Sequence, residues 1–139
     1  MQPGYRILDH PADIGIESWG STFSEALSMA VSGLVSLIVD PSSVEPTEQR
    51  FISVSAEDIE SLVVKTLSEV LFLFDGAHFV PKTLEVFSES PNGLQGSLSG
   101  EPLQGDKHHM RIDVKAVTYH QLSVNRRPAS VTINVYLDI

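Results

Sequence analysis

Two stretches of the chain carry apolar residues at the three-and-four spacing of an amphipathic helix. In the first, Thr22 and Glu25 match a capping box, in which two side chains satisfy free backbone donors at the start of a helix. This helix is expected to stop near Asp40-Pro41, where proline cannot continue it. The second stripe covers residues 59–74, and Gly76 is expected to supply a left-handed cap. The pattern therefore predicts two helices, each with one buried face.

The remaining periodic segments alternate between apolar and polar residues, which indicates strands. Pro91-Asn92-Gly93 between two of them is a strong hairpin signal, and residues 101–109 read as a polar loop. Two helices and about seven strands predict an α+β fold, with both helices packed on one face of a mostly antiparallel sheet. The 139 residues contain no linker, so we expect one domain over 1–139. The expected strands are 5–8, 14–19, 49–55, 83–88, 94–99, 111–119 and 131–138.

Charge and composition narrow the classes of function. The formal net charge is −9, from 18 acidic and 9 basic residues, and such a surface repels phosphate backbones, so we expect no direct nucleic-acid binding. There is no cysteine, which excludes a disulfide scaffold, a cysteine zinc site and a cysteine nucleophile. No apolar run reaches membrane length, and no charged-then-apolar leader opens the chain. We therefore expect a cytoplasmic protein without a membrane association.

The last two residues are the strongest candidate for chemistry. An alternating strand runs into Asp138 and Ile139 without a polar tail, so the sheet should hold the Asp138 side chain beside the Ile139 α-carboxylate. Two carboxylates held close together repel each other unless a cation lies between them. A hard-metal site is one interpretation. The other is a buried strand that simply ends in a solvated acid.

A second acidic group lies near the beginning of the chain. Asp9, His10 and Asp13 fall within five residues, on a turn that contains Pro11. Side chains at this spacing can coordinate a cation together, or they can cap the turn by accepting hydrogen bonds from backbone amides. Because oxygen ligands dominate, a bound ion is expected to be Ca²⁺, or else Mg²⁺ or Mn²⁺, before Zn²⁺.

Other polar residues carry weaker signals. The pair His108-His109 is expected to be solvated in its polar loop. His120 is either a proton carrier near neutral pH or a polar residue at a strand end. Lys115 is a solvated charge on a sheet face, or a counter-charge for a nearby carboxylate cluster. No glycine-rich phosphate loop, serine elbow or nucleophile with an adjacent base is present, so stand-alone catalysis is not expected.

Three blocks of the sequence resemble the archease family. The first is the run 5–14 with Trp19-Gly20 and the helix opening 23–26, the second is 114–120, and the third is the terminal 138–139. The family pattern at these places is an Asp-His-Thr-Ala-Asp turn, a Lys-Ala-(Ile/Val)-Thr-Tyr strand and a chain that ends on Asp-Ile or Asp-Val. The blocks lie at the beginning, the three-quarter point and the end, so the resemblance covers the whole chain.

The resemblance implies an accessory factor for an RtcB-type RNA ligase in tRNA splicing and RNA repair. Such a factor promotes guanylylation of the ligase and allows multiple turnover. The resemblance also implies a bound divalent cation, usually Ca²⁺, and Lys115 and His120 fall in the block linked to activation. The chain departs from the family at Pro11, where threonine is common; proline lacks the hydroxyl and the backbone N–H. The implied ligands are Asp13, Asp138 and the Ile139 carboxylate, with Asp9 and His10 as possible additions.

Two other functions fit the same residues. A carboxylate cluster could serve a stand-alone metal-dependent hydrolase or phosphatase, although the sequence shows no second metal site. A metal-free interaction or chaperone-like module is the remaining alternative. Metal binding without stand-alone hydrolysis would favour the ligase activator over both.

Overall fold

The computed structural model describes residues 1–9 and 13–139 of the chain. A short 3-10 turn over Pro41–Ser43 follows the first helix. No helix in the described part of the chain is both long and apolar enough to cross a membrane. The helices and strands of these residues are, in order, β1 (Gly4–Asp9), β2 (Ile14–Gly20), α1 (Phe23–Ile38), β3 (Glu48–Ser55), α2 (Ile59–Ala77), β4 (Phe79–Ser90), β5 (Gly93–Pro102), β6 (Ala116–Arg127) and β7 (Ser130–Asp138).

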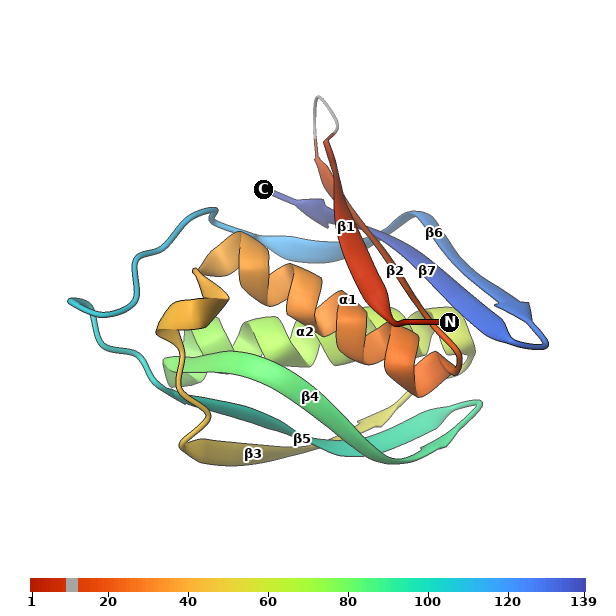
Figure 1. The fold of residues 1–139 in the computed structure, drawn as a ribbon, viewed down its shortest axis with the longest axis horizontal. Helices are drawn as coiled ribbons and strands as arrows, with labels where there is room; N and C mark the ends of the chain where they lie inside the picture. Colours follow the sequence, from red (N-terminus) through yellow and green to blue (C-terminus); the bar gives the residue numbers. More distant parts are fainter. Residues whose placement is uncertain (10–12) are drawn as a thin grey trace.

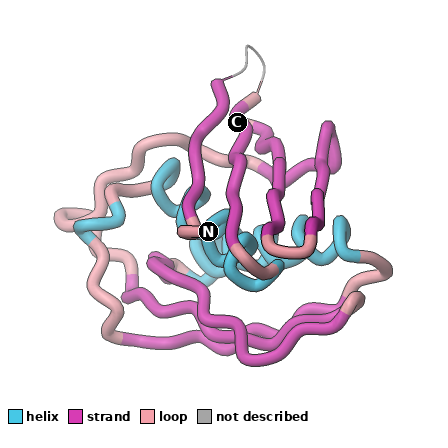
Figure 2. The backbone as a smooth tube through the Cα atoms, turned by 45° about the vertical axis from the view of Figure 1, so that its right-hand side comes forward, coloured by secondary structure: helices cyan, strands magenta, loops and turns pink. Residues whose placement is uncertain are grey.

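The strands form two antiparallel sheets with both helices between them (Figure 1). One sheet has the strand order β1-β2-β7-β6, and the other has the order β3-β5-β4. The same three layers remain visible in Figure 2, where the molecule is turned by 45°. The predicted α+β class, with two helices on antiparallel strands, is confirmed. The hydrophobic pattern did not indicate that the strands divide into two sheets, because that division depends on pairing between distant segments.

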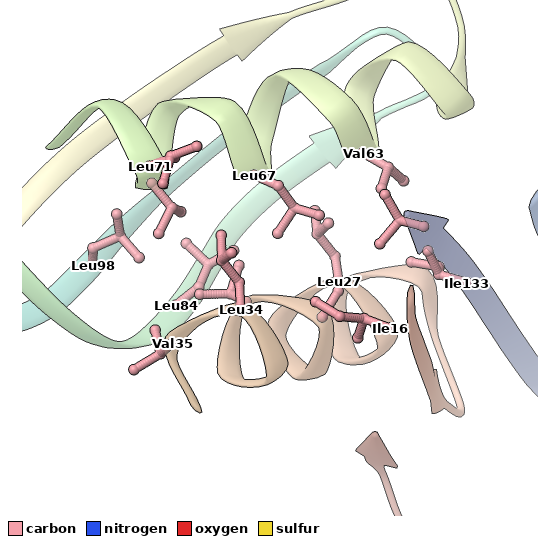
Figure 3. Close-up of a cluster of buried hydrophobic side chains, with 14 of the residues drawn as sticks. Ile16, Leu27, Leu34, Val35, Val63, Leu67, Leu71, Leu84, Leu98 and Ile133 are labelled. Carbon is pink, nitrogen blue, oxygen red and sulfur yellow. The ribbon is translucent and has the colours of Figure 1, made fainter. Parts of the chain in front are cut away.

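The hydrophobic core fills the space between the two sheets. Leu27 and Leu34 of α1 meet Leu67 of α2, while Ile133 and Leu98 reach the core from opposite sheets (Figure 3). All of these side chains are fully buried. The apolar residues of the alternating C-terminal strand are buried as predicted, and they are Val131, Ile133, Val135 and Leu137.

The structure confirms the predicted start of the first helix but not the predicted cap of the second. At the start of α1 the Thr22 hydroxyl accepts a hydrogen bond from the Glu25 N–H at 3.1 Å, as expected for an N-cap. The Glu25 carboxylate accepts from the Ser21 N–H at 2.9 Å, one residue earlier than in a capping box. At the end of α2 the prediction of Gly76 as the cap is wrong. His78 takes the left-handed conformation, with φ 54°, because α2 continues past Gly76 before the chain turns into β4.

The prediction of a strand over residues 111–119 is wrong for its first half. The N–H groups of Arg111 and Ile112 donate to the carbonyls of Ile38 and Leu37, at 2.8 and 3.1 Å. Those carbonyls stand at the C-terminus of α1, where they lack partners within the helix. The segment therefore caps a helix instead of extending a sheet, and β6 begins only at Ala116.

The prediction that His108 and His109 are both solvated is wrong for His108. His108 as a whole is 2% exposed; its Nε2 lies 2.9 Å from the Glu101 carboxylate, and its Nδ1 accepts a hydrogen bond from the Gln104 N–H at 3.0 Å. Lys107 also donates to Glu101, at 2.9 Å. This network folds the polar segment back onto the end of β5. His109 is exposed, as expected.

Candidate functional site

All four strands of the β1-β2-β7-β6 sheet begin or end at the same end of the sheet. Because neighbouring strands are antiparallel, the end of β1 at Asp9, the start of β2 at Ile14, the end of β7 at Asp138 and the start of β6 at Ala116 lie together. Figure 2 shows the C-terminus near the end of β1. Residues of all three resemblance blocks therefore lie close together. We call this place, with Asp9, Asp13, Lys115 and Asp138, the sheet end.

Asp13 and Asp138 occupy neighbouring positions at the sheet end. Ile14 pairs with Leu137 across β2 and β7, and one step further along both strands lie Asp13 and Asp138. Ile14 and Leu137 are buried in the core, so the alternation of side chains directs the two acids toward the opposite face. Asp13 is half-buried and Asp138 is exposed. Asp9 pairs with Ile14 from the other side, so it reaches the sheet end on the face of Ile14 and not on the face of Asp13 and Asp138.

Lys115 joins the sheet end from the position just before β6. Its backbone N–H donates to the Asp138 carbonyl at 2.8 Å, one residue before Ala116 pairs with Asp138. The Lys115 side chain is exposed, whereas Val114 before it is buried. It lines a surface hollow of about 310 Å³ between α2 and β6, together with Asp75 and Phe72. The lysine is thus held beside the acids by its backbone while its ammonium stays accessible.

His120 lies further along β6, in an irregular part of the strand. Thr118 pairs with Tyr136 and Ser123 with Asn134, so four residues of β6 lie opposite Val135 alone. Such a bulge locally redirects side chains. The His120 ring is exposed and meets the Tyr136 ring edge-on, with centroids 6.4 Å apart.

The bulge also holds a residue in an unusual conformation. Gln121 has φ 53°, which a residue other than glycine seldom adopts. Tyr136 and Thr118 were not singled out in the sequence, although the Thr118 hydroxyl donates to the Tyr136 carbonyl at 3.0 Å and accepts from the His120 N–H at 3.3 Å. Nothing in the alternating pattern marks these residues, because the register shift depends on pairing with β7.

The donor set at the sheet end suits a hard cation in its chemistry. Asp13, Asp138 and the Ile139 main-chain carboxylate supply only oxygen, the ligand type that Ca²⁺ and Mg²⁺ prefer. Within residues 1–9 and 13–139, no group of three or more His, Asp or Glu side chains is arranged to hold a metal ion. The predicted set contains two such side chains and one main-chain group, and it stays a prediction. His10 and Pro11 lie outside the described residues.

Comparisons with known proteins agree on one family. The family model described as "Archease protein family (MTH1598/TM1083)" matches residues 5–139. A protein archease of Thermococcus gammatolerans is 37% identical over 123 residues, which cover 86% of this chain and 87% of the relative. A protein archease of Saccharolobus islandicus is 34% identical over 136 residues, covering 97% and 98%.

Solved structures extend the likeness to the fold. The solution structure of protein 1598 of Methanobacterium thermoautotrophicum superposes with a TM-score of 0.80 at 28% identity, covering 98% of this chain and 99% of that one. The crystal structure of an archease from Thermotoga maritima, described as a possible chaperone, gives a TM-score of 0.66 at 22% identity and shares the fold. It covers 95% of this chain and 94% of its own. The chain belongs to the archease family.

Proposed function

We propose that this protein is a metal-binding accessory factor that activates an RtcB-type RNA ligase in tRNA splicing and RNA repair. It acts by promoting guanylylation of the ligase and so allowing multiple turnover. It has no catalytic activity of its own. The proposal extends the family assignment to a particular partner and a particular ion.

The observation that supports the proposal is the meeting of acids and a lysine at the sheet end. Asp13 and Asp138 lie one step beyond the Ile14–Leu137 pair, and the Lys115 N–H is bonded to the Asp138 carbonyl. These positions come from the three separate blocks of the sequence. Like charges that face each other on adjacent strands destabilise a sheet, so the stability of the sheet does not explain why two acids occupy these adjacent strand ends.

Each group has a distinct part in this proposal. Asp13, Asp138 and the Ile139 carboxylate hold the divalent cation, Ca²⁺ before Mg²⁺ or Mn²⁺, and the cation supplies positive charge for phosphate groups at the partner's active site. Lys115, exposed beside them, contacts the partner or the nucleotide phosphates there. The acidic surface, with a net charge of −9, attracts a basic RNA-binding enzyme.

The test combines a metal titration with a turnover assay. Wild-type protein is titrated with Ca²⁺ and Mn²⁺ by calorimetry, and an RtcB-type ligase is assayed with and without it. Asp13→Asn should lose metal binding and ligase stimulation while it keeps the fold. Asp106→Asn removes the same charge from an exposed loop and should behave as the wild type.

The same experiment separates the alternatives. Metal binding with release of phosphate from a model phosphoester, and no effect on the ligase, would point to a hydrolase. Ligase stimulation or suppression of aggregation that is unchanged in Asp13→Asn would point to a metal-free interaction module. Either result would overturn the proposal.

A further inference from the structure

A pair of exposed phenylalanines lies on the sheet opposite the candidate site. Phe51 of β3 is 77% exposed and Phe87 of β4 is 54% exposed, and their ring centroids are 6.2 Å apart. They lean toward each other across β5, the strand between β3 and β4. A single exposed phenylalanine is ordinary on a protein surface, but two rings in contact from two strands form a shaped surface.

The two rings border a hollow. Phe87 is the extra residue of a bulge in β4, between the pairs Val86–Gly96 and Ser88–Gln95. The hollow measures about 380 Å³, and its lining consists of Phe51, Ile52, Ser53, Phe87, Gln95 and Gly96. We call this surface the aromatic face. It is turned away from the helices, which cover the other side of the sheet (Figure 1).

The charges around the aromatic face are acidic. Glu85 of β4 pairs with Ser97 of β5, and Ser97 pairs on its other side with Phe51 of β3. Paired residues point to the same face of a sheet, so the Glu85 side chain shares a face with Phe51. No ion pair joins Glu85 to another residue in the part of the chain that the structure describes. The surface therefore offers aromatic rings and a carboxylate together, without a cation.

The basic residues of these three strands are used elsewhere. The guanidinium of Arg50 stacks on Phe79, 4.5 Å from the ring centroid, and pairs with Glu48 at 2.9 Å. The Lys82 ammonium donates to the Val44 carbonyl at 2.8 Å. The strands contain no other lysine or arginine, so they supply no free cation of their own to the aromatic face.

We propose that the aromatic face binds an arginine-bearing segment of a protein partner. A guanidinium can lie flat on a phenyl ring and donate to a carboxylate at the same time, which matches Phe51, Phe87 and Glu85. A second copy of this chain would bring two acidic faces together, and a phosphate backbone would be repelled. The aromatic face is on a different sheet from the sheet end, so the proposal stands independently of the ligase function.

The test is a nuclear magnetic resonance titration of the full chain at physiological salt. The probes are an arginine-rich peptide and the same peptide with lysine at every arginine. Shift changes should concentrate on the aromatic face, and the arginine peptide should bind more tightly because only guanidinium stacks on the rings. The Phe51→Ser/Phe87→Ser double variant and Glu85→Gln should each weaken binding by roughly tenfold.

Phe72→Ser is the matched control, because Phe72 is an exposed phenylalanine at 62% but lies on α2. It should bind the arginine peptide as the wild type does. If the double variant binds the arginine peptide as tightly as the wild type does, or if the shift changes spread over the whole acidic surface, then net charge alone causes the binding and the proposal fails. It also fails if sedimentation shows that the wild type is a dimer and that the double variant is a monomer. Wild-type binding to neutral lipid vesicles that the double variant loses would contradict the proposal as well.

Discussion

At the scale of the residue, carboxylate side chains have different roles according to their surroundings. Glu101 is 4% exposed and receives hydrogen bonds from Lys107, His108 and the Glu45 N–H, so it organises a loop. Asp138 is exposed at the end of a strand beside Lys115, so it is available to a ligand. A carboxylate bound by three donors stabilises the fold, whereas one that faces solvent can serve binding.

Lys115→Ala should separate function from stability. The Lys115 side chain is exposed, and its bond to Asp138 uses the backbone N–H, which alanine retains. The free energy of unfolding should therefore change by less than about 0.5 kcal/mol, while ligase stimulation falls by about tenfold or more. Denaturant unfolding and the turnover assay measure the two effects. Lys65→Ala removes an exposed lysine from α2 and should change neither; if Lys115→Ala instead unfolds the domain, the lysine is structural.

Glu101 should make stability depend on acid. The hydrogen bonds from Lys107 and the Glu45 N–H, with one from His108, lower the pKa of Glu101 from 4.5 to about 2. A carboxyl group whose pKa is lowered by folding stabilises the protein fully above the unfolded pKa, and this contribution is lost as the pH falls. The unfolding free energy should therefore decline between about pH 4.5 and 2.

Glu101→Gln provides the comparison. Glutamine keeps the size but not the charge, so the variant should be less stable at neutral pH by about 1–3 kcal/mol. Its stability should also fall less steeply in acid than that of the wild type. Denaturant unfolding across the pH range gives both quantities, and Glu89→Gln, at an exposed position of β4, should keep the wild-type slope. Equal slopes for Glu101→Gln and wild type would contradict the assignment.

At the scale of the element, ends and irregularities determine what each helix and strand can do. Segment 111–112 caps α1, which fixes where β6 can begin and hence where Lys115 lies. The bulge in β6 places His120 next to Tyr136. At the end of α2, His78 turns the chain so that Phe79 enters the core.

His78→Gly should stabilise the protein. A residue with a Cβ pays a steric cost at φ 54°, and glycine avoids it. After allowing for the greater freedom of glycine in the unfolded chain, the gain should be about 0.5–1 kcal/mol. Denaturant unfolding is the measurement. His109→Gly, at an exposed position whose φ is not positive, should be neutral or slightly destabilising; a loss of stability in His78→Gly would show that its side chain makes a contact of greater value.

At the scale of the whole molecule, the two ends of the chain lie at opposite ends of one sheet. β1 begins at Gly4, paired with Trp19, and β7 ends at Asp138 beside Ala116, at the other end of the strands. Figure 1 shows the N-terminus and the C-terminus well apart. The candidate metal site and the aromatic face also occupy different sheets, so the two proposed ligand surfaces lie on separate layers of strands.

Short tags at the two termini should therefore have unequal effects. A tag after Ile139 moves the terminal charge away from Asp13 and Asp138 and adds bulk at the sheet end. We expect it to leave the thermal midpoint nearly unchanged but to remove most metal binding and ligase stimulation. The same tag before Met1 should be harmless. Calorimetry and the turnover assay compare the two forms, and equal activity would refute Ile139 as a ligand.

Periodicity indicated the two helices and most of the strands of this protein, but not where β6 begins or where α2 ends. The stripe that includes Leu27 and Leu34, and the alternation of Val131 to Leu137, each bury one face, so both were predictable from neighbours within a few residues. The Pro91-Asn92 turn is equally local. The acids and the lysine of the candidate site were named from the sequence through the resemblance blocks, since the alternating pattern by itself left their roles open.

Only the tertiary structure decided how the elements combine. The split into two sheets, the capping of α1 by residues 111–112 and the burial of His108 against Glu101 all depend on pairing that a local pattern does not encode. Arg111 reaches α1 from 75 residues away, where it bonds the Ser36 carbonyl. A backbone donor binds whichever acceptor the folded chain leaves unpaired, so its partner is settled by the whole molecule.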